Sequence, residues 1–166
     1  MALNKFTAAL ALTAGLALAA GAAIAHEGHQ GPPPKTPGGK AAWARHDNFK
    51  AQGAAFKAIV DELKKDSPDT AVLSSNANKV KATSTALPSW FPKGSGPESG
   101  VKTDAKAEVW SDAAGFAAAA NRLQVEVSKF QQLATAGDIP GMKAQVRVVG
   151  GACKNCHDKY RVPEKK

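Results

Sequence analysis

Four segments of the chain carry apolar or large residues at alternating steps of three and four, and this spacing constrains the fold more than any other feature. A period near 3.6 gathers such residues on one face of a helix. A half-buried strand would instead need alternation at every second residue, and no segment shows it. The sequence therefore predicts an all-α protein.

The first two stripes precede a loop rich in proline and glycine. The stripe that starts after Lys40 contains Trp43, His46, Phe49, Gly53, Phe56, Val60 and Leu63. The next follows Ser67 and Pro68, an expected N-cap and first-turn proline, and contains Leu73, Ala77, Val80, Ser84 and Leu87. Both stripes predict amphipathic helices.

The other two stripes follow this loop, PSWFPKGSGPESGVKT. One contains Ala113, Phe116, Ala120, Leu123, Val127, Phe130 and Ala134, and the other Met142, Val146, Val149, Cys153 and either Cys156 or His157. Ala136 and Gly137 make a short connection, with Asp138 as the expected N-cap of the last helix. Four such helices bury their stripes most simply in an antiparallel four-helix bundle, and their inward Gly and Ala leave room for a further group.

The beginning of the chain predicts export. Lys5 provides a positive charge, residues 6–20 are an apolar run, and Ala23 to Ala25 form a small-residue cleavage site. The run is too short for a spanning helix, so we expect no stable membrane insertion. We interpret residues 1–25 as a signal peptide cleaved after Ala25, residues 26–39 as a flexible tail and residues 40–166 as the folded domain.

The charge of the exported chain is positive. Loss of Lys5 from the 22 basic residues leaves 21 against 14 acidic residues, a formal charge of +7. The basic residues are scattered and accompany no recognisable nucleic-acid module. The sequence therefore favours acidic proteins or anionic membrane surfaces as partners and predicts no binding to nucleic acid.

The pentapeptide CKNCH, residues 153–157, holds both cysteines of the chain. A structural zinc site needs about four ligands, and no second cysteine pair is present. A redox Cys-x-x-Cys pair normally begins a helix in a thioredoxin-like setting, whereas this pair lies deep in the last predicted helix. Covalent haem attachment fits best, because two thiols add to the porphyrin vinyl groups and the adjacent His becomes an axial ligand.

The position of the motif determines where the rest of a haem pocket must come from. Only DKYRVPEKK follows His157, so upstream helices must cover the opposite face of the haem. Met142, the one methionine left after export, is on the helix of His157, about 22 Å away at 1.5 Å per residue. Met142 therefore cannot provide a ligand to that opposite face.

Three stretches resemble cytochrome c′ and the related class II cytochromes c: CKNCHDKYR, ARHDNFK in the first helix, and FPKGSGP with KTDAKAEVWSDAAGF. The resemblance covers essentially all of residues 40–162. It implies a periplasmic four-helix bundle, often dimeric, that holds one haem c. High-spin members bind NO or CO at five-coordinate iron, and low-spin members use a Met from the first helix and transfer electrons.

Position by position, the resemblance implies thioether links at Cys153 and Cys156, a proximal ligand at His157, and Arg161 near the proximal pocket. Arg161 is one helical turn beyond His157, which agrees with that place. A solvated base at the end of the helix is the alternative for Arg161.

The resemblance also selects residues of the first helix. Arg45 matches a base beside the haem propionates, where a bidentate guanidinium is favoured, and an exposed arginine is the alternative. Phe49 matches the distal residue, and its phenyl ring has no lone pair for iron. We therefore expect five-coordinate, high-spin iron beneath Phe49. Trp110 is interpreted as core packing beside the haem.

The expected function is that of a periplasmic, non-enzymatic haem protein that transfers electrons with redox partner proteins and binds NO or CO. A peroxidase with His46 and Arg45 on the distal side is one alternative. A low-spin carrier with His46 as second axial ligand is another. The last is a bundle without haem, in which the two cysteines form a disulfide.

Overall fold

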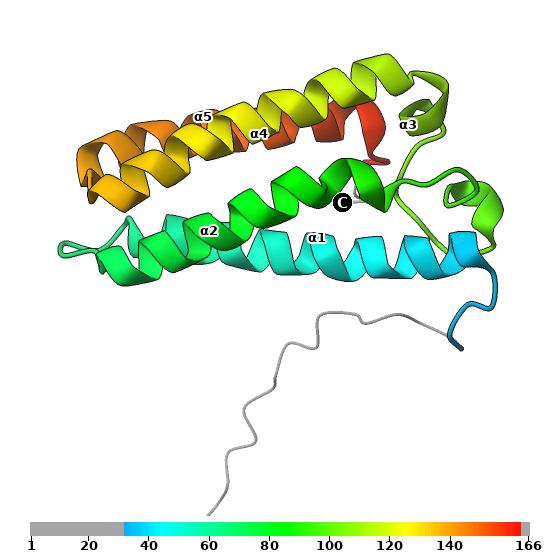
Figure 1. Ribbon diagram of the computed structural model, residues 1–166, viewed down its shortest axis with the longest axis horizontal. Helices are drawn as coiled ribbons and strands as arrows, with labels where there is room; N and C mark the ends of the chain where they lie inside the picture. Colours follow the sequence, from blue (N-terminus) through cyan, green and yellow to red (C-terminus); the bar gives the residue numbers. More distant parts are fainter. Residues whose placement is uncertain (1–31, 164–166) are drawn as a thin grey trace, which may run out of the picture. The chain divides into compact units, whose positions relative to one another are not determined.

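The structure, a computed structural model, describes residues 32–163, and over that range it is helical. The long helices are α1 (Pro37–Glu62), α2 (Thr70–Ala86), α4 (Ala113–Ala136) and α5 (Ile139–Tyr160), as Figure 1 shows. Short helical turns, η1 (Leu87–Trp90), η2 (Pro97–Ser99) and α3 (Glu108–Ser111), occupy the long connection. The prediction of an all-α four-helix bundle is confirmed. The predicted signal peptide lies outside the described residues, as does the beginning of the predicted tail.

Side chains at the helix ends set where the helices begin. Helix α1 begins at Pro37, before the expected boundary at Lys40, because the Thr36 hydroxyl accepts a hydrogen bond from the Gly39 N–H at 3.1 Å. The N-cap of α2 is Asp69, whose carboxylate accepts from the Ala71 N–H at 2.8 Å, so the prediction of Ser67 was wrong. Asp138 caps α5 as predicted.

Three of the four predicted stripes agree with the buried faces. Every predicted residue of the α2 stripe is buried, and in α4 only Ala113 is exposed. In α5, Met142 and Val149 are buried, whereas Val146 and both cysteines are half-buried. The helical periodicity therefore located these inward faces correctly.

The stripe predicted for α1 is confirmed in part. Leu63 is buried, and Phe49, Phe56 and Val60 are half-buried, whereas His46 and Gly53 are exposed. The fully buried residues of this helix are Gly39, Ala42, Arg45, Ala55, Ile59 and Glu62. The pattern missed them because small alanines and charged groups that are buried with partners give no apolar signal.

The helices pack in sequence around the bundle. Helix α1 packs on α2, α2 on α4, and α4 on α5, and consecutive long helices run in opposite directions (Figure 1). Their shared core has Leu73, Val127, Met142 and Val149 among its most deeply buried side chains. Helices α1 and α5 are not among the closely packed pairs of residues 32–163. The bundle is thus closed on the α2 and α4 side and open between α1 and α5.

The connection between α2 and α4 folds back onto the start of α1. Gly38 approaches Gly94 so closely that a Cβ at position 38 would collide with the Gly94 carbonyl oxygen. Gly94 itself has φ of +83°, in the left-handed region that glycine adopts readily. Two glycines therefore allow the loop backbone to lie directly on the helix.

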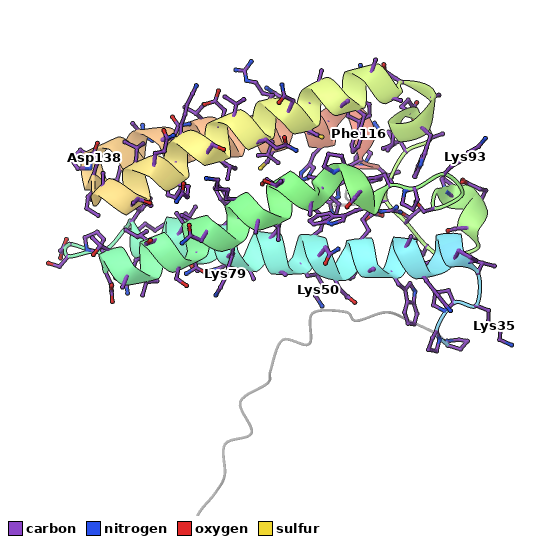
Figure 2. All side chains as sticks on the ribbon, viewed as in Figure 1. Lys35, Lys50, Lys79, Lys93, Phe116 and Asp138 are labelled. Atoms are coloured by element: carbon purple, nitrogen blue, oxygen red, sulfur yellow. The ribbon has the colours of Figure 1, made fainter. Side chains whose placement is uncertain are left out.

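The surface of the bundle carries dispersed charge. Lys50, Lys79 and Lys93 are exposed and point away from the bundle in Figure 2. Among the helices of residues 32–163, none is long and apolar enough to cross a bilayer.

Candidate haem-binding site

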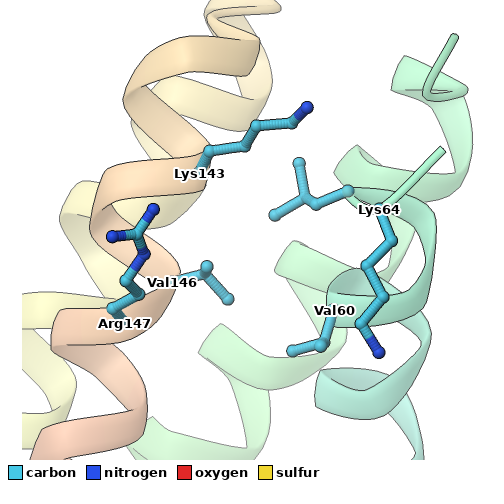
Figure 3. A pocket seen from close by; sticks show the side chains of 6 residues that line it. Val60, Lys64, Lys143, Val146 and Arg147 are labelled. Carbon is cyan, nitrogen blue, oxygen red and sulfur yellow. The ribbon is translucent and has the colours of Figure 1, made fainter. Parts of the chain in front are cut away.

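Two pockets lie on the open side of the bundle. The first, of about 360 Å³, is shown in Figure 3 and is lined by Val60, Leu63, Lys64, Lys143, Val146 and Arg147. The second, of about 570 Å³, is lined by Phe56, Gly150, Cys153, Lys154, His157, Asp158, Arg161, Val162 and Pro163. Both volumes are within the range typical of pockets for small molecules and cofactors.

The second pocket contains most of the CKNCH motif. Cys153 and His157 are four residues apart on α5, so they share a helix face, and both line the pocket. Cys156 is half-buried and packs against the bundle core. Both thiols are free. The structure therefore brings a thiol and an imidazole to one opening, with the second thiol on the neighbouring turn.

The electrostatics of the thiols disfavour zinc and redox chemistry. Burial, with a smaller contribution from the neighbouring Cys156 thiol, raises the pKa of Cys153 to about 11, and burial also raises the pKa of Cys156. Both metal binding and thiol–disulfide exchange use the thiolate form. In addition, residues 32–163 contain no group of three or more His, Cys, Asp or Glu arranged to hold a metal ion.

Two glycines precede the motif on α5, and Gly150 lines the pocket. Position 151 has nothing within 4 Å of where a Cβ would lie, and a Cβ at Gly150 would meet only the ring of Phe56, at 3.9 Å. No side chain therefore fills the space next to Gly150. The pocket, the thiols, the imidazole and this space fit a haem group.

Phe49 and His46 lie differently on α1. Phe49 is half-buried and makes edge-to-face contacts with Trp90, at 5.1 Å between ring centroids, and with Phe91, at 6.1 Å. His46 is exposed. Of the two residues considered for the distal side, Phe49 is therefore the one that packs into the bundle.

Arg45 is 3% exposed, so the alternative of a surface arginine was wrong. Its Nη1 donates to the Trp90 carbonyl at 3.2 Å and to the Ser95 hydroxyl at 3.0 Å. Its Nη2 donates to the Ser95 carbonyl at 2.8 Å and to the Thr103 hydroxyl at 2.9 Å. These bonds use all four terminal N–H groups. Only Nε–H lies outside these four bonds. The contact of Arg45 with a haem propionate stays a prediction.

Arg161 lines the second pocket together with His157, but not for the reason inferred from the sequence. Helix α5 ends at Tyr160, and Arg161 has an extended backbone, with φ −114° and ψ 139°. It forms an isolated antiparallel bridge with Ala105, and its guanidinium lies 3.8 Å from the Asp104 carboxylate. The end of α5 is therefore fixed by the long connection.

Asp112 was missed by sequence reasoning. Its carboxylate accepts from the Tyr160 hydroxyl at 2.9 Å, pairs with the Lys159 ammonium at 2.6 Å and caps α4 by accepting from the Gly115 N–H at 3.1 Å. The hydrogen bonds from Lys159, Tyr160 and Gly115, in that order, lower its pKa. One carboxylate thus joins the start of α4 to the end of α5, and its place before a helix was the only signal available.

Trp110 has a polar contact as well as the predicted packing. The indole is half-buried, its ring contacts Phe91, and its Nε1 donates to the Phe91 carbonyl at 3.1 Å and to the Pro92 carbonyl at 3.2 Å. It therefore packs against the long connection, where Arg45 is also bound.

Comparison with known proteins gives one consistent answer. A family model described as "Cytochrome C'" matches residues 40–161. Cytochrome c′ of Pararhodospirillum photometricum is 36% identical over 118 residues, which cover 70% of this chain and 92% of the relative. Cytochrome c′ of Rubrivivax gelatinosus is 45% identical over 89 residues, which cover 50% of this chain and 69% of the relative.

Solved structures agree with these matches. The crystal structure of Rubrivivax gelatinosus cytochrome c′ aligns with a TM-score of 0.69 and 35% identity, and covers 75% of this chain and 96% of that one. A nitric oxide complex of a variant of Alcaligenes xylosoxidans cytochrome c prime also aligns with a TM-score of 0.69, at 29% identity, and covers 76% and 97%.

Proposed function

The chain belongs to the cytochrome c′ family, and from that premise we propose that it is an exported haem c protein that binds small diatomic gases and exchanges electrons with partner proteins. When bound, haem supplies one-electron chemistry and gas binding at its iron. The observation that carries the proposal is the opening between α1 and α5, which Cys153 and His157 line.

The proposed attachment residues are those of the CKNCH motif, of which Cys153 and His157 line that opening. Cys153 and Cys156 form the two thioether links, and His157 is the proximal ligand. Arg161, on the rim of the same pocket, lies beside His157, and its bridge to Ala105 holds it there. Burial in the folded bundle raises the pKa of Cys153 to about 11, which disfavours the thiolate that disulfide exchange and metal binding require.

The register between α1 and α5 supports Phe49 as the distal residue. Val60 and Leu63 share a pocket with Lys143 and Val146, and Phe56 faces Gly150. The two helices run in opposite directions (Figure 1). Two further turns in this register set residue 49 level with residue 157.

A distal phenylalanine has consequences for ligand choice. Its ring offers iron no lone pair, so the iron is five-coordinate and high-spin in the resting protein. An incoming ligand must displace the ring, which favours small neutral molecules such as NO and CO over bulky anions. The nitric oxide complex of the Alcaligenes xylosoxidans variant supports this choice of ligand.

The alternatives that use His46 are less well supported. His46 is exposed, whereas Phe49 packs against Trp90 and Phe91 on the inside. The four terminal N–H groups of Arg45 are bound to the loop and so cannot assist a peroxidase reaction. The cytochrome c′ family consists of non-enzymatic haem proteins, which also disfavours the peroxidase.

Localisation and partners complete the proposal. Residues 1–25 direct export to the periplasm and are removed after Ala25. The tail predicted for residues 26–39 overlaps the start of α1, which begins at Pro37. The dispersed positive charge favours acidic redox partners, and no nucleic acid is involved. The protein forms a homodimer, which sedimentation at tens of micromolar tests independently of the haem assignment.

Visible spectra test the coordination. The ferric wild-type protein at neutral pH should give a high-spin spectrum, and Phe49→Ala should raise the affinity of the ferrous form for CO. His46→Ala is the matched variant on the same helix and should leave both observations unchanged. A low-spin ferric spectrum that becomes high-spin in His46→Ala would instead establish the bis-His alternative.

A further inference from the structure

Arg45 connects α1 to three separate points of the long connection. Its acceptors are on Trp90, Ser95 and Thr103, and the four distances range from 2.8 to 3.2 Å. Ser95 is fully buried, and its hydroxyl also donates to the Pro92 carbonyl at 2.7 Å. A single side chain from the helix thus supplies donors to a loop that would otherwise have several unpaired buried acceptors.

The same guanidinium packs on aromatic rings. Its central carbon lies 4.7 Å from the centroid of Phe91 and 5.8 Å from that of Trp110. Both contacts are within the range of a cation–π interaction. Arg45 therefore fixes Phe91 through its ring and Trp90 through its carbonyl oxygen.

Trp90 and Phe91 are also the two rings that contact Phe49. Phe49 is four residues after Arg45, so both side chains project from one face of α1. Phe91 contacts both side chains through its ring, whereas Trp90 contacts Phe49 through its ring and Arg45 through its backbone carbonyl; we call these two residues the aromatic wall. A displacement of the Phe49 ring must either push against this wall or break its edge-to-face contacts with it.

We propose that Arg45 is a positioning residue: it holds Trp90 and Phe91 against Phe49 and thereby limits how readily a gas molecule reaches the haem iron. The inference rests on the proposed function and gives Arg45 a role that differs from the propionate contact expected from the sequence. The arginine acts through the loop, and it touches neither gas nor iron.

The test is the rate of CO association with the ferrous holoprotein, measured by flash photolysis. Arg45→Met keeps an unbranched side chain but removes the donors and the charge. It should raise the association rate constant about tenfold, which corresponds to about 1.4 kcal/mol of barrier. Arg45→Lys retains the charge but not the planar fork, and should give a smaller increase. Lys50→Met removes an exposed cation from the same helix and should change nothing.

A double-mutant cycle separates positioning from a general loss of structure. Once Phe49→Ala has removed the ring, adding Arg45→Met should change the CO association rate less than about twofold, because the side chain whose position Arg45 controls is then absent. If Arg45→Met has the same effect with and without Phe49, the proposal is overturned. A reduction potential that shifts equally in both backgrounds would show that Arg45 acts on the haem carboxylates instead.

Limited trypsin digestion gives a readout that does not depend on CO. Lys93 and Lys102 lie in the loop that Arg45 holds, so Arg45→Met holoprotein should be cleaved there faster than wild type or Lys50→Met. Unchanged cleavage would overturn the proposal. A wild-type protein that carries haem but binds no CO would defeat the proposed function, whereas this digestion would still report on the loop.

If Arg45→Met does not accumulate, Thr103→Val removes a single acceptor with little change of volume. It should raise the CO rate in the same direction by about two- to threefold, and only when Phe49 is present. An unchanged rate in Thr103→Val together with unchanged tryptic cleavage would then count against the proposal.

Discussion

The two sides of the bundle are built on different principles. On the closed side, α2 and α4 share fully buried residues such as Leu73 and Val127, and side chains alone fill the interior. On the open side, α1 and α5 are separated by two pockets, and the residues nearest the motif include Gly150 and Gly151. The closed side resembles the core of an ordinary helical bundle, whereas the open side lacks a layer of side chains.

The difference shows how a small bundle can both fold and hold a large planar group. The three tightly packed helix pairs provide the buried apolar area that stabilises the fold. The α1–α5 pair therefore does not have to bury apolar area to stabilise the fold, and the α5 positions at this opening include thiols, an imidazole and a glycine. A cofactor then buries the surface that the helices leave exposed to each other.

Removal of the two cysteines proposed to attach the haem is the most direct test of the difference between the closed and open sides. The variant with Cys153→Ala and Cys156→Ala should lose all acid-stable haem, because no other residue in the chain can form a thioether. Amide exchange should then accelerate first on α1 and α5, while α2 and α4 remain protected. Retention of covalent haem would refute the attachment assignment.

Lys154→Ala is the matched control for the cysteine variant. Lys154 lies between the two cysteines and is exposed, with its ammonium 2.5 Å from the Asp158 carboxylate. An exposed pair of this kind contributes little to stability. The control should retain haem and wild-type exchange rates.

A pair of valines compares the two sides directly. Val127→Ala, at a position 1% exposed on the closed side, should lower the free energy of unfolding by about 2 kcal/mol through lost burial and an unfilled cavity. Val60→Ala, half-buried at the open side, should cost less than about 1 kcal/mol. Urea denaturation of the two holoproteins measures the difference, and equal costs would mean that both sides are packed alike.

The smallest expected effect concerns the carboxylate that fastens α5 to α4. The hydrogen bonds from Lys159, Tyr160 and Gly115 lower the pKa of Asp112 below its ordinary value of 3.8. Its contribution to stability is therefore complete above pH 3.8 and is lost as the pH falls through the lower pKa of the folded protein. Asp112→Asn keeps an N-cap but lacks the charge, so it should be less stable than wild type at neutral pH.

The pH profile of the thermal midpoint checks this prediction. The difference between wild type and Asp112→Asn should be constant above about pH 5 and shrink below pH 4. Asp66→Asn, in the exposed connection after α1, provides the comparison for general loss of negative charge. A difference that grows on acidification would reverse the sign and reject the assignment.

The sequence predicted the closed side well, because period and burial coincide there. In the α2 stripe the predicted residues recur at helical spacing, and all five of them, Leu73, Ala77, Val80, Ser84 and Leu87, are buried. In α1 the same method found only the side that faces the pockets, since the rest of the buried face carries alanines and the charged side chain of Arg45. Hydropathy patterns give no sign of a buried cation whose partners are loop carbonyls and hydroxyls 45 to 58 residues further along the chain.

In the candidate site, too, local features could be predicted from the sequence, whereas contacts between distant segments could not. The CKNCH motif was readable because its chemistry depends on a local spacing within one helix. The place of Arg161 was anticipated for the wrong reason, since an extended bridge to Ala105 sets it and not another helical turn. The anchor formed by Asp112 and Tyr160 joins positions 48 residues apart, and nothing in the local sequence marks such a pair.

The close approach of Gly38 to Gly94 restricts which substitutions the chain can accept over evolutionary time. Any other residue at position 38 would drive its Cβ into the opposing carbonyl, and any other residue at position 94 would need a left-handed backbone that L-residues rarely adopt. A substitution at one of these positions does not compensate for a substitution at the other. Neither glycine can therefore be replaced by a single mutation without a clash or backbone strain. Gly53, exposed and with open space around it, is the opposite case, because alanine there would improve helix propensity by about 1 kcal/mol. Two glycines of α1 thus differ: position 38 has no room for a side chain, whereas position 53 can accept alanine.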